Sequence, residues 1–358
     1  MKIDLIAGAR PNFVKIAAII HAIKQMEKPI DYRLIHTGQH YDENLSGNLF
    51  KDLQLPAPNI NLNIGSGTQA EQTAAIIIAY ERLLQLSKPD LCLVVGDVTS
   101  SMACAITAKK MQVKLAHVEA GIRSNDWKMP KEVNRVLIDS IADYFFTTTR
   151  RATDFLLNTG KNKDQVFFVG NTMIDTLLNF KPYFRKPKIW DTIKLKKKEF
   201  ILLTLHRPAN ISQETNLKTY VLEILKNSGT LPVIFPAHPR TRKILNKINI
   251  DHPRLFITDA LSYLEFNYLV ENCKAVLTDS GGITEETTVL GIPCLTLRDN
   301  TERPETITEG TNMLLGTDPV AIAPAMKKLF SEEWKKGNIP KLWDGKAGER
   351  ILKVLENL

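Results

Sequence analysis

The stretch LCLVVGDVTSSMACAITAKKMQVKLAHVEA (residues 91–120) carries the pattern that decides the fold. An apolar run ends in Gly-Asp, a segment with the apolar spacing of an amphipathic helix follows, and a second apolar run ends in Glu-Ala. Runs that are continuously apolar, rather than apolar at alternate positions, are typical of strands covered on both faces. The stretch therefore predicts two strands of a parallel sheet joined by a helix.

Similar runs recur along the whole chain, most of them separated by a gap of helical length. Those of the first half cover residues 2–9, 31–38, 91–97, 114–120, 144–149 and 166–171. Those of the second half cover residues 200–206, 232–238, 255–260, 275–280, 293–299 and 311–316. Between the halves, residues 176–199 are rich in Lys and Pro and have little periodicity, which is typical of a linker.

We therefore predict an α/β protein with two doubly wound, Rossmann-like domains and a cleft between them. The predicted boundaries are 1–175 for the N-terminal domain, 176–199 for the linker and 200–340 for the C-terminal domain. The length of 358 residues agrees, because it exceeds what one hydrophobic core usually serves. Residues 341–358 include a helical period, and we expect this helix to pack back on the N-terminal domain.

The composition narrows the classes of function. The net charge is +8 without a long basic block or a nucleic-acid-binding motif, which favours anionic small molecules over nucleic acid as partners. No run approaches the ~20 apolar residues of a membrane helix, and the N-terminus has the pattern of a first strand rather than a signal peptide. The four cysteines lie in or beside apolar runs and lack metal-ligand spacing. We expect a cytoplasmic protein with reduced cysteines.

Unusual polar residues directly follow the apolar runs at seven places. In doubly wound sheets ligands bind beyond the carboxyl ends of the strands, so these positions predict a site shared by the two domains. They are Gly8-Ala9-Arg10, Thr37-Gly38-Gln39-His40, Gly96-Asp97, Glu119, His206-Arg207, His238 and Asp279-Ser280-Gly281-Gly282.

The segment VLTDSGGITEE (276–286) predicts a phosphate site. Gly281 and Gly282 permit close backbone approach, and the helix expected behind Ser280 offers free N–H groups and a positive dipole end. Glu286 lies a turn further on, where its carboxylate could accept ribose hydroxyls. In the following loop, Arg303 could bind a pyrophosphate bidentately. The alternatives are an ordinary capped strand-to-helix connection and a solvent-facing charged turn.

The other strand ends supply candidate cations and acid–base groups. Burial in a site could tune the pKa values of their carboxyl and imidazole groups. The alternatives are surface cations after a glycine turn, a structural N-cap at Asp97 and structural roles for the two histidines. No HExxH motif or other metal spacing occurs, so we predict no metal. The candidates are Arg10, Lys15, Asp97, Glu119, His206 and His238.

Taken together, these motifs resemble those of the non-hydrolysing UDP-N-acetylglucosamine 2-epimerases. The resemblance runs nearly from end to end, and its most specific blocks are HVEAGIRS (117–124) and DSGGITEETTVLGIPCLTLRDNTERPE (279–305). The other blocks are GARPNFVK, HTGQHYD, VVGD, EVNR, FVGNTMIDT, HRPAN and PAHPRTR. The resemblance implies a GT-B-like fold, a homodimer, and neither metal nor nicotinamide nor other cofactor.

The resemblance also implies a reaction. C2 of UDP-N-acetylglucosamine is inverted to give UDP-N-acetylmannosamine, by loss of UDP and its re-addition to a 2-acetamidoglucal, for surface polysaccharide synthesis. Elimination from a carbon whose proton has low acidity needs a positioned base and a stabilised leaving group. A closed cleft would keep water from the intermediate.

By position, the resemblance assigns residues to the two parts of the substrate. For UDP they are Arg10, His238, Phe266, Ser280, Gly281, Gly282, Glu286 and Arg303. For the sugar they are Lys15, Asp97, Glu119, Arg135 and His206. Asp97 and Glu119 are the leading acid–base candidates, and neither is assigned to one face of the sugar.

Two departures from the family pattern affect these expectations. The usual Pro-Glu-Glu is Pro-Lys-Glu here, so Lys131 replaces a proposed catalytic carboxylate. Either Glu132 supplies the carboxylate or Lys131 meets a negative charge on the substrate, since an ammonium group is a weak base unless its pKa is strongly depressed. The usual HRREN is HRPAN here, which lacks two residues linked to an allosteric UDP-N-acetylglucosamine site. The remaining allosteric candidates are Gln39, His40 and Arg207.

Four other functions stay open on the sequence. A 2-epimerase of an acidic sugar of the UDP-2,3-diacetamido-glucuronate type would suit Lys131. A GT-B glycosyltransferase would transfer the sugar without exchange at C2, and the retained Asp97 and Glu119 argue against it. A hydrolysing epimerase matches residues 299–305 poorly. A UDP-sugar sensor without turnover has only Lys131 in its favour.

Overall fold

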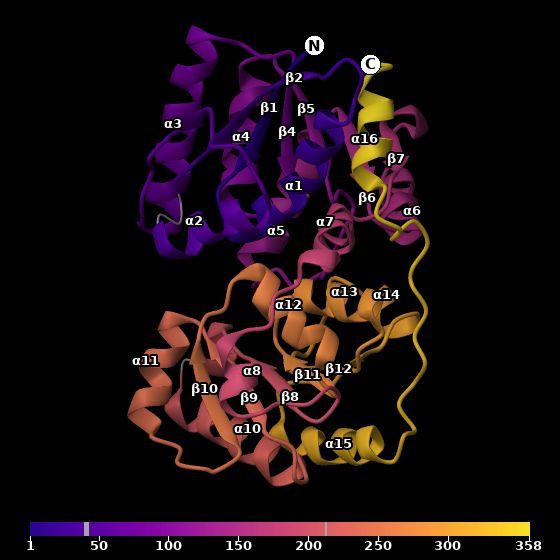
Figure 1. The fold of residues 1–358 in the computed structure, drawn as a ribbon. Coiled ribbons are helices and arrows are strands. Elements are labelled where there is room, and N and C mark those ends of the chain that lie inside the picture. Colours follow the sequence, from indigo (N-terminus) through magenta and orange to yellow (C-terminus); the bar gives the residue numbers. More distant parts are fainter. Residues whose placement is uncertain (39–42, 212) are drawn as a thin grey trace. The chain divides into compact units, whose positions relative to one another are not determined.

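The computed structural model describes residues 1–38, 43–211 and 213–358, and the chain divides into two compact units (Figure 1). Unit 1 comprises Met1–Asn179 and Lys341–Leu358, and unit 2 comprises Phe180–Pro340. Each unit contains one parallel β-sheet with helices on both faces. The predicted class, α/β with two doubly wound Rossmann-like sheets, is confirmed.

The sheet of unit 1 has the strand order β3-β2-β1-β4-β5-β6-β7, and its neighbouring strands are parallel. The strands are β1 (Lys2–Ala7), β2 (Asp31–His36), β3 (Ile60–Asn61), β4 (Leu91–Val95), β5 (Lys114–Val118), β6 (Tyr144–Thr147) and β7 (Val166–Phe168). The sequence pattern missed β3, because a strand of two residues shows no periodicity. The order runs outward from β1 in both directions, so the switch point of this sheet lies between β1 and β4.

Helices α3, α4 and α5 pack on one face of this sheet. Val94 and Leu115 of the strands share a buried core with Tyr80 of α3, Cys104 of α4 and Ile138 of α5. Burying such a side chain stabilises the fold by about 1.5–3 kcal/mol. The helices of unit 1 are α1 (Arg10–Lys24), α2 (Glu43–Asp52), α3 (Gln69–Leu86), α4 (Thr99–Lys110), α5 (Pro130–Ile141), α6 (Arg150–Asn158), α7 (Thr172–Phe180, ending at the unit boundary) and α16 (Ala347–Leu355), with a 3-10 turn at Lys163–Gln165.

The sheet of unit 2 has the order β10-β9-β8-β11-β12-β13 and is also parallel. Its strands are β8 (Ile201–Thr204), β9 (Val233–Ala237), β10 (Leu255–Asp259), β11 (Ala275–Thr278), β12 (Cys294–Thr296) and β13 (Asn312–Leu314). Its helices are α8 (Lys188–Thr192), α9 (Pro208–Ile211), α10 (Glu214–Asn227), α11 (Pro239–Ile248), α12 (Tyr263–Asn272), α13 (Gly281–Leu290), α14 (Glu305–Thr308) and α15 (Ile322–Phe330), with 3-10 turns at Lys181–Tyr183 and Pro319–Ala321.

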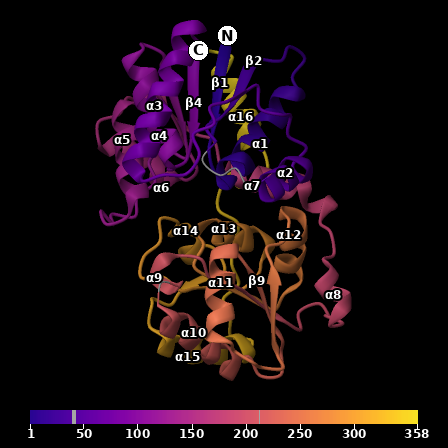
Figure 2. The same cartoon turned by 90° about the vertical axis from the view of Figure 1, so that its left-hand side faces the viewer.

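Successive residues of β8 point into two different cores, which explains why the run is apolar at every position. Ile201 and Leu203 belong to the core that includes α10 and α15, two helices that lie side by side (Figure 2). Leu202 belongs to the core on the opposite face, with Leu269 of α12. A strand buried on both faces has no position for a solvated side chain.

The C-terminal segment belongs to unit 1. The buried Trp343 donates a hydrogen bond from Nε1 to the carbonyl oxygen of Thr148 at 3.0 Å, and the backbone N–H of Gly348 donates to Oδ2 of Asp175 at 2.7 Å. Helix α16 lies beside α1 (Figure 1). A Cβ atom on Gly348 would lie 2.8 Å from the carbonyl oxygen of Ala18, so glycine permits this close packing. Residues 176–199, for which the sequence predicts a linker, contain the end of α7 and all of α8.

Candidate active site

Three neighbouring strands of unit 1 end at the candidate acid–base residues. Strands β1, β4 and β5 adjoin in the sheet, and Val95 is in register with Val118. Asp97 therefore follows β4 beside Glu119, which follows β5. Lys15 comes from α1, the helix that begins just after β1. The carboxyl ends of parallel strands thus gather these groups at one edge of the sheet.

Glu119 and Lys15 form a buried ion pair. The ammonium group of Lys15 donates to Oε2 of Glu119, and the two residues are 7% and 3% exposed. Glu119 adopts a φ of +70°, a left-handed conformation that is uncommon for a residue with a side chain. The backbone N–H of Glu119 donates to the carbonyl oxygen of Phe146 at 3.0 Å, which ties the turn to β6. A cation in contact with a buried carboxyl group favours the charged form of that group.

Asp97 is held by helix α5. Its Oδ2 accepts a hydrogen bond from the guanidinium of Arg135, and its Oδ1 lies 3.4 Å from the ammonium nitrogen of Lys131. Asn134 donates from Nδ2 to the backbone carbonyl of Asp97 at 2.9 Å. Arg135 is buried, whereas the side chain of Lys131 is 48% exposed. The structure thus brings both predicted carboxylates together with three of the predicted cations.

Glu132 has a different environment from the other two carboxylates. Its Oε2 accepts hydrogen bonds from the backbone N–H and Oγ of Ser124, both at 2.9 Å, and from Arg135 at 2.8 Å. Its Oε1 accepts from the backbone N–H of Asn125 at 3.0 Å. Burial raises the pKa of Glu132, but the hydrogen bonds from Ser124, Arg135 and Asn125 lower it more, and the pKa lies below its ordinary value. These contacts favour a role in holding the loop over a role in proton transfer.

In unit 2, Asp279 organises the ends of β8 and β11. This fully buried carboxylate accepts from the backbone N–H of Arg207 at 2.9 Å and from Nδ2 of Asn210 at 3.1 Å, and it lies 2.8 Å from Nδ1 of His206. Burial raises the pKa of Asp279, but the hydrogen bond and charge of His206 lower it more, so the pKa falls below its ordinary value. Asp279 therefore positions His206. The sequence pattern placed Asp279 among the polar residues at strand ends, but Asp279 was not assigned a role in the site.

The phosphate-binding candidates lie at the start of α13. Ser280 precedes the helix, Gly281 is its first residue and Gly282 its second. The helix has ten residues, enough to present free N–H groups and a dipole at this end. Glu286, one turn on, is buried, and burial together with the lesser influence of the Glu285 carboxylate raises its pKa to about 7.

The remaining predicted ligand residues lie in both units. Arg303 is buried, and its Nε donates to Oε1 of Glu285 at 2.7 Å, so the charged loop after β12 is anchored to α13. Phe266 on α12 packs against the unit 2 core, and His238 directly follows β9 and is exposed. Arg10 is the first residue of α1, where burial lowers its pKa and the charge of Asp52 opposes that effect.

The allosteric candidates are placed only in part. Gln39 and His40 lie outside the described residues. Arg207 stands just before α9, with its backbone N–H on Asp279. A regulatory site thus stays a prediction.

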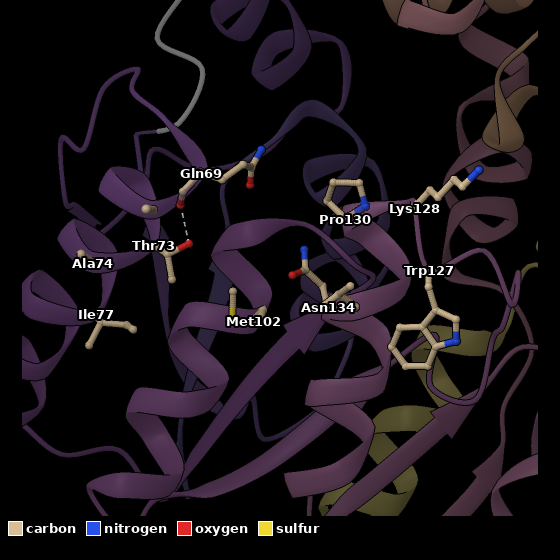
Figure 3. Close-up of a pocket in the computed structure, with 11 residues that line it drawn as sticks. Gln69, Thr73, Ala74, Ile77, Met102, Trp127, Lys128, Pro130 and Asn134 are labelled. Carbon is tan, nitrogen blue, oxygen red and sulfur yellow. Dashed lines mark hydrogen bonds between the residues drawn. The ribbon is translucent and has the colours of Figure 1, made fainter.

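An open groove of about 630 Å³ lies on unit 1 between α3, α4 and α5 (Figure 3). Ile77 of α3, Met102 of α4 and Val133 of α5 line it, together with Trp127, a residue that is 66% exposed. Asn134, which also lines the groove, is the residue that binds the backbone of Asp97.

The described part of the chain contains neither a metal-binding cluster nor a membrane-spanning helix. Among residues 1–38, 43–211 and 213–358, no three His, Cys, Asp or Glu side chains are grouped as they would be around a metal ion. Within the same ranges, no helix is both long and apolar enough to cross a membrane.

Comparison with known proteins is consistent with this geometry. The family described as UDP-N-acetylglucosamine 2-epimerase matches residues 21–356. The UDP-N-acetylglucosamine 2-epimerase of Methanocaldococcus jannaschii is 40% identical over 99% of both chains. A crystal structure of M. jannaschii UDP-GlcNAc 2-epimerase in complex with UDP-GlcNAc and UDP has a TM-score of 0.90 and 39% identity over 100% of both chains.

A relative with a different named substrate is also similar. The UDP-2,3-diacetamido-2,3-dideoxy-D-glucuronate 2-epimerase of Pseudomonas aeruginosa is 38% identical over 88% of both chains. The family match and these long alignments confirm both the recognised family and the GT-B-like fold class. This chain belongs to the non-hydrolysing UDP-N-acetylglucosamine 2-epimerase family, and it is an isomerase of the UDP-sugar 2-epimerase type.

Proposed function

We propose that this enzyme inverts C2 of UDP-N-acetylglucosamine and forms UDP-N-acetylmannosamine for surface polysaccharide synthesis. The observation that carries the proposal is the pair of carboxylates at neighbouring strand ends, Asp97 and Glu119, each in contact with a cation. Relatives named for UDP-N-acetylglucosamine, at 40% identity and below, support this choice of sugar.

The proposed reaction has two steps, in which one of the two carboxyl groups acts as a base and the other as an acid. One carboxylate removes the C2 proton, the C–H electron pair forms a C1=C2 double bond, and the C1–O bond breaks to release UDP as an anion. The other carboxylic acid then returns a proton to C2 of the 2-acetamidoglucal from the opposite face, while an oxygen of UDP adds to C1. Positioned proton transfer of this kind contributes about 10²–10⁴-fold to the rate.

Before the reaction, the cations of unit 1 would order the two groups, of which one must be ionised to accept the C2 proton and the other protonated to return one. Lys15 faces Glu119, and Arg135 faces Asp97. In unit 2, Asp279 holds His206, and the start of α13 offers backbone N–H groups to a phosphate. Arg303 and Glu286 would add contacts to the pyrophosphate and the ribose, as the family resemblance implies. UDP, as the leaving group, would be stabilised by these donors.

Exchange at C2 tests the reaction directly. The enzyme is incubated with UDP-N-acetylglucosamine in D₂O, and the sugars are followed by proton NMR. We expect deuterium at C2 together with the appearance of UDP-N-acetylmannosamine. Transfer of the sugar to an acceptor without exchange at C2 would instead indicate a glycosyltransferase. Release of free UDP and free sugar, without deuterium at C2 of the UDP-sugar, would indicate a hydrolysing enzyme.

A second substrate, a UDP-diacetamido-glucuronate, is favoured by one observation. The Lys131 ammonium group lies 3.4 Å from Asp97 and its side chain is about half exposed, so it could face a substrate carboxylate beside the acid–base group. The P. aeruginosa relative, which is named for this acidic sugar, supports the choice. A single ammonium–carboxylate contact in a partly buried site contributes roughly 1–3 kcal/mol.

Substitution of Lys131 separates the two substrates. If the acidic sugar is the substrate, Lys131→Met should lower kcat/KM for it by about 10- to 100-fold. The kcat/KM for UDP-N-acetylglucosamine should change much less, because that sugar has no carboxylate for Lys131 to bind. Steady-state assays on both sugars, with Lys128→Met as a nearby control, provide the measurement. Equal losses on both sugars would show that Lys131 acts through Asp97 and not through a substrate charge.

We also propose a homodimer in the cytoplasm. The exposed apolar side chains of Ile78, Trp127, Val133 and Leu137 on and beside α3 and α5 support a contact surface for a second copy. The four buried free cysteines support a reducing compartment. Light scattering on the purified protein should give about twice the chain mass of 40.4 kDa. A mass equal to one chain would contradict the dimer.

A further inference from the structure

A buried histidine connects the two strand ends that carry Asp97 and Glu119. The ring of His117, in β5, is fully buried, and its Nδ1 lies 2.6 Å from Oδ1 of Asp139 in α5. On the other side of the ring, Nε2 lies 3.0 Å from the carbonyl oxygen of Gly96. The ring therefore joins α5 to the residue that precedes Asp97.

These two contacts fix both nitrogens of the ring. A carbonyl oxygen only accepts hydrogen bonds, so Nε2 carries the proton that it donates to Gly96. Burial raises the pKa of Asp139, but the charges and hydrogen bonds of His117 and Arg123 lower it more, so the pKa lies below its ordinary value. The ring of His117 thus lies between two fixed oxygen atoms, one at the strand end before Asp97 and one on α5.

The second oxygen of Asp139 holds the turn after β5. Its Oδ2 accepts from the backbone N–H of Gly121 at 3.0 Å and pairs with Arg123 at 2.7 Å. Glu119 lies in this turn with its φ of +70°, a strained conformation that persists only where surrounding contacts hold it. Arg123 is itself fixed over the ring of Phe155, 4.7 Å from the ring centre.

Gly96 lies directly against the Glu119–Lys15 ion pair. It has a φ of +64°, and its N–H donates to the carbonyl oxygen of Val118 at 2.9 Å. A Cβ atom on Gly96 would lie 3.0 Å from Oε2 of Glu119 and 3.1 Å from Nζ of Lys15. The residue whose carbonyl His117 binds therefore touches one acid–base carboxylate and directly precedes the other.

We propose that the hydrogen-bonded His117–Asp139 pair is a positioning device for the epimerisation. His117 orients the peptide between Gly96 and Asp97, and Asp139 orients the turn that carries Glu119. The pair would thereby keep the two carboxylates at a fixed separation, as required if they act on one carbon from opposite faces. The inference rests on the proposed C2 chemistry, in which a misplacement of about 1 Å costs about 100-fold in rate.

The kinetic test uses His117→Gln, Asp139→Asn and the double variant. Gln can still donate to the carbonyl of Gly96 but cannot span Gly96 and Asp139 at once as the ring does, so we expect kcat to fall by about 10- to 100-fold with KM within about twofold. Asp139→Asn should have a similar effect. Because the two residues act as one unit, the double variant should be no slower than the slower single variant. His252→Gln, a histidine in a loop of unit 2, is the control and should keep its kcat.

An NMR measurement on the unsubstituted protein tests the contact with Gly96 without any substrate. With ¹⁵N-labelled histidine, Nε2 of His117 should carry a proton that is protected from exchange with solvent, and that signal should be missing from His117→Gln. An Nε2 without a proton, or unchanged kcat in folded single variants, would overturn the inference. Independent, additive losses in kcat would also overturn it. If the unsubstituted enzyme shows no C2 exchange with any UDP-sugar, the proposed function fails, whereas the NMR result still decides whether His117 binds the carbonyl of Gly96.

Discussion

Replacing Glu119 by Gln is expected to lower kcat for C2 epimerisation by about 10²–10⁴-fold. The amide cannot accept or return the C2 proton, and the loss should appear both in C2 deuterium exchange and in product formation. The substitution also leaves the buried ammonium group of Lys15 without its charge partner, which costs about 3–5 kcal/mol of stability. UDP binding should be retained, because the predicted UDP contacts of the α13 region do not involve Glu119.

The double variant Lys15→Met/Glu119→Gln separates chemistry from stability. It removes both buried charges, so the free energy of unfolding should recover toward that of the unsubstituted enzyme. The kcat should stay low, since the proton-transfer group is still missing. Urea unfolding and NMR exchange on the same preparations provide the two readouts. Recovery of kcat in the double variant would show that Glu119 serves the fold and not the proton transfer.

The stability of the protein should depend on pH through Glu286, and Glu286→Gln should remove that dependence. Burial raises the pKa of Glu286 from 4.5 to about 7, so the buried group favours its neutral form. The contribution of this residue to stability is complete below about pH 4.5 and is lost as the pH rises through 7. The loss amounts to about 3 kcal/mol by pH 8, because each unit of pKa difference between folded and unfolded chain is worth about 1.4 kcal/mol.

Urea unfolding at pH 5 and at pH 8 measures this effect. We compare the unfolding free energy of Glu286→Gln with that of the unsubstituted protein at each pH. From pH 5 to pH 8 this difference should shift by about 2–3 kcal/mol in favour of the variant, since Gln does not ionise. Glu333→Gln, at an exposed position of unit 2, is the matched control and should show no such gain. If the unfolding free energies of Glu286→Gln and the unsubstituted protein differ by the same amount at pH 5 and at pH 8, this result would contradict the raised pKa of Glu286.

Local sequence patterns were sufficient for the architecture. A continuously apolar run such as 91–95 is typical of a strand buried on both faces, and the residues of β8 in unit 2 likewise point into two different cores. The rule that ligands bind at the carboxyl ends of parallel strands selected Asp97, Glu119 and Ser280 without any contact information. The two-residue strand β3 could not be predicted from such patterns, because only its pairing with β2 defines it as a strand.

Which side chains act together could not be predicted from the order of residues. The pairing of Lys15 with Glu119, and of Asp97 with Arg135 and Lys131, arises because β1, β4 and β5 are neighbours in the sheet while α1 and α5 begin at its edge. The sequence presents Glu132 as a replacement acid, but the tertiary structure surrounds it with loop hydrogen-bond donors. His117 looks like an ordinary residue inside a strand.

The proposed role of His117 follows only from its contacts with the carbonyl of Gly96 on one side and Asp139 on the other, at 21 and 22 residues' distance along the chain. The residue types that suit proton transfer and anion binding can therefore be identified from the sequence. Their charge states and partners are decided by burial and by contacts between segments remote in the chain, because the free energy of a buried charge depends on the groups within a few ångströms of it.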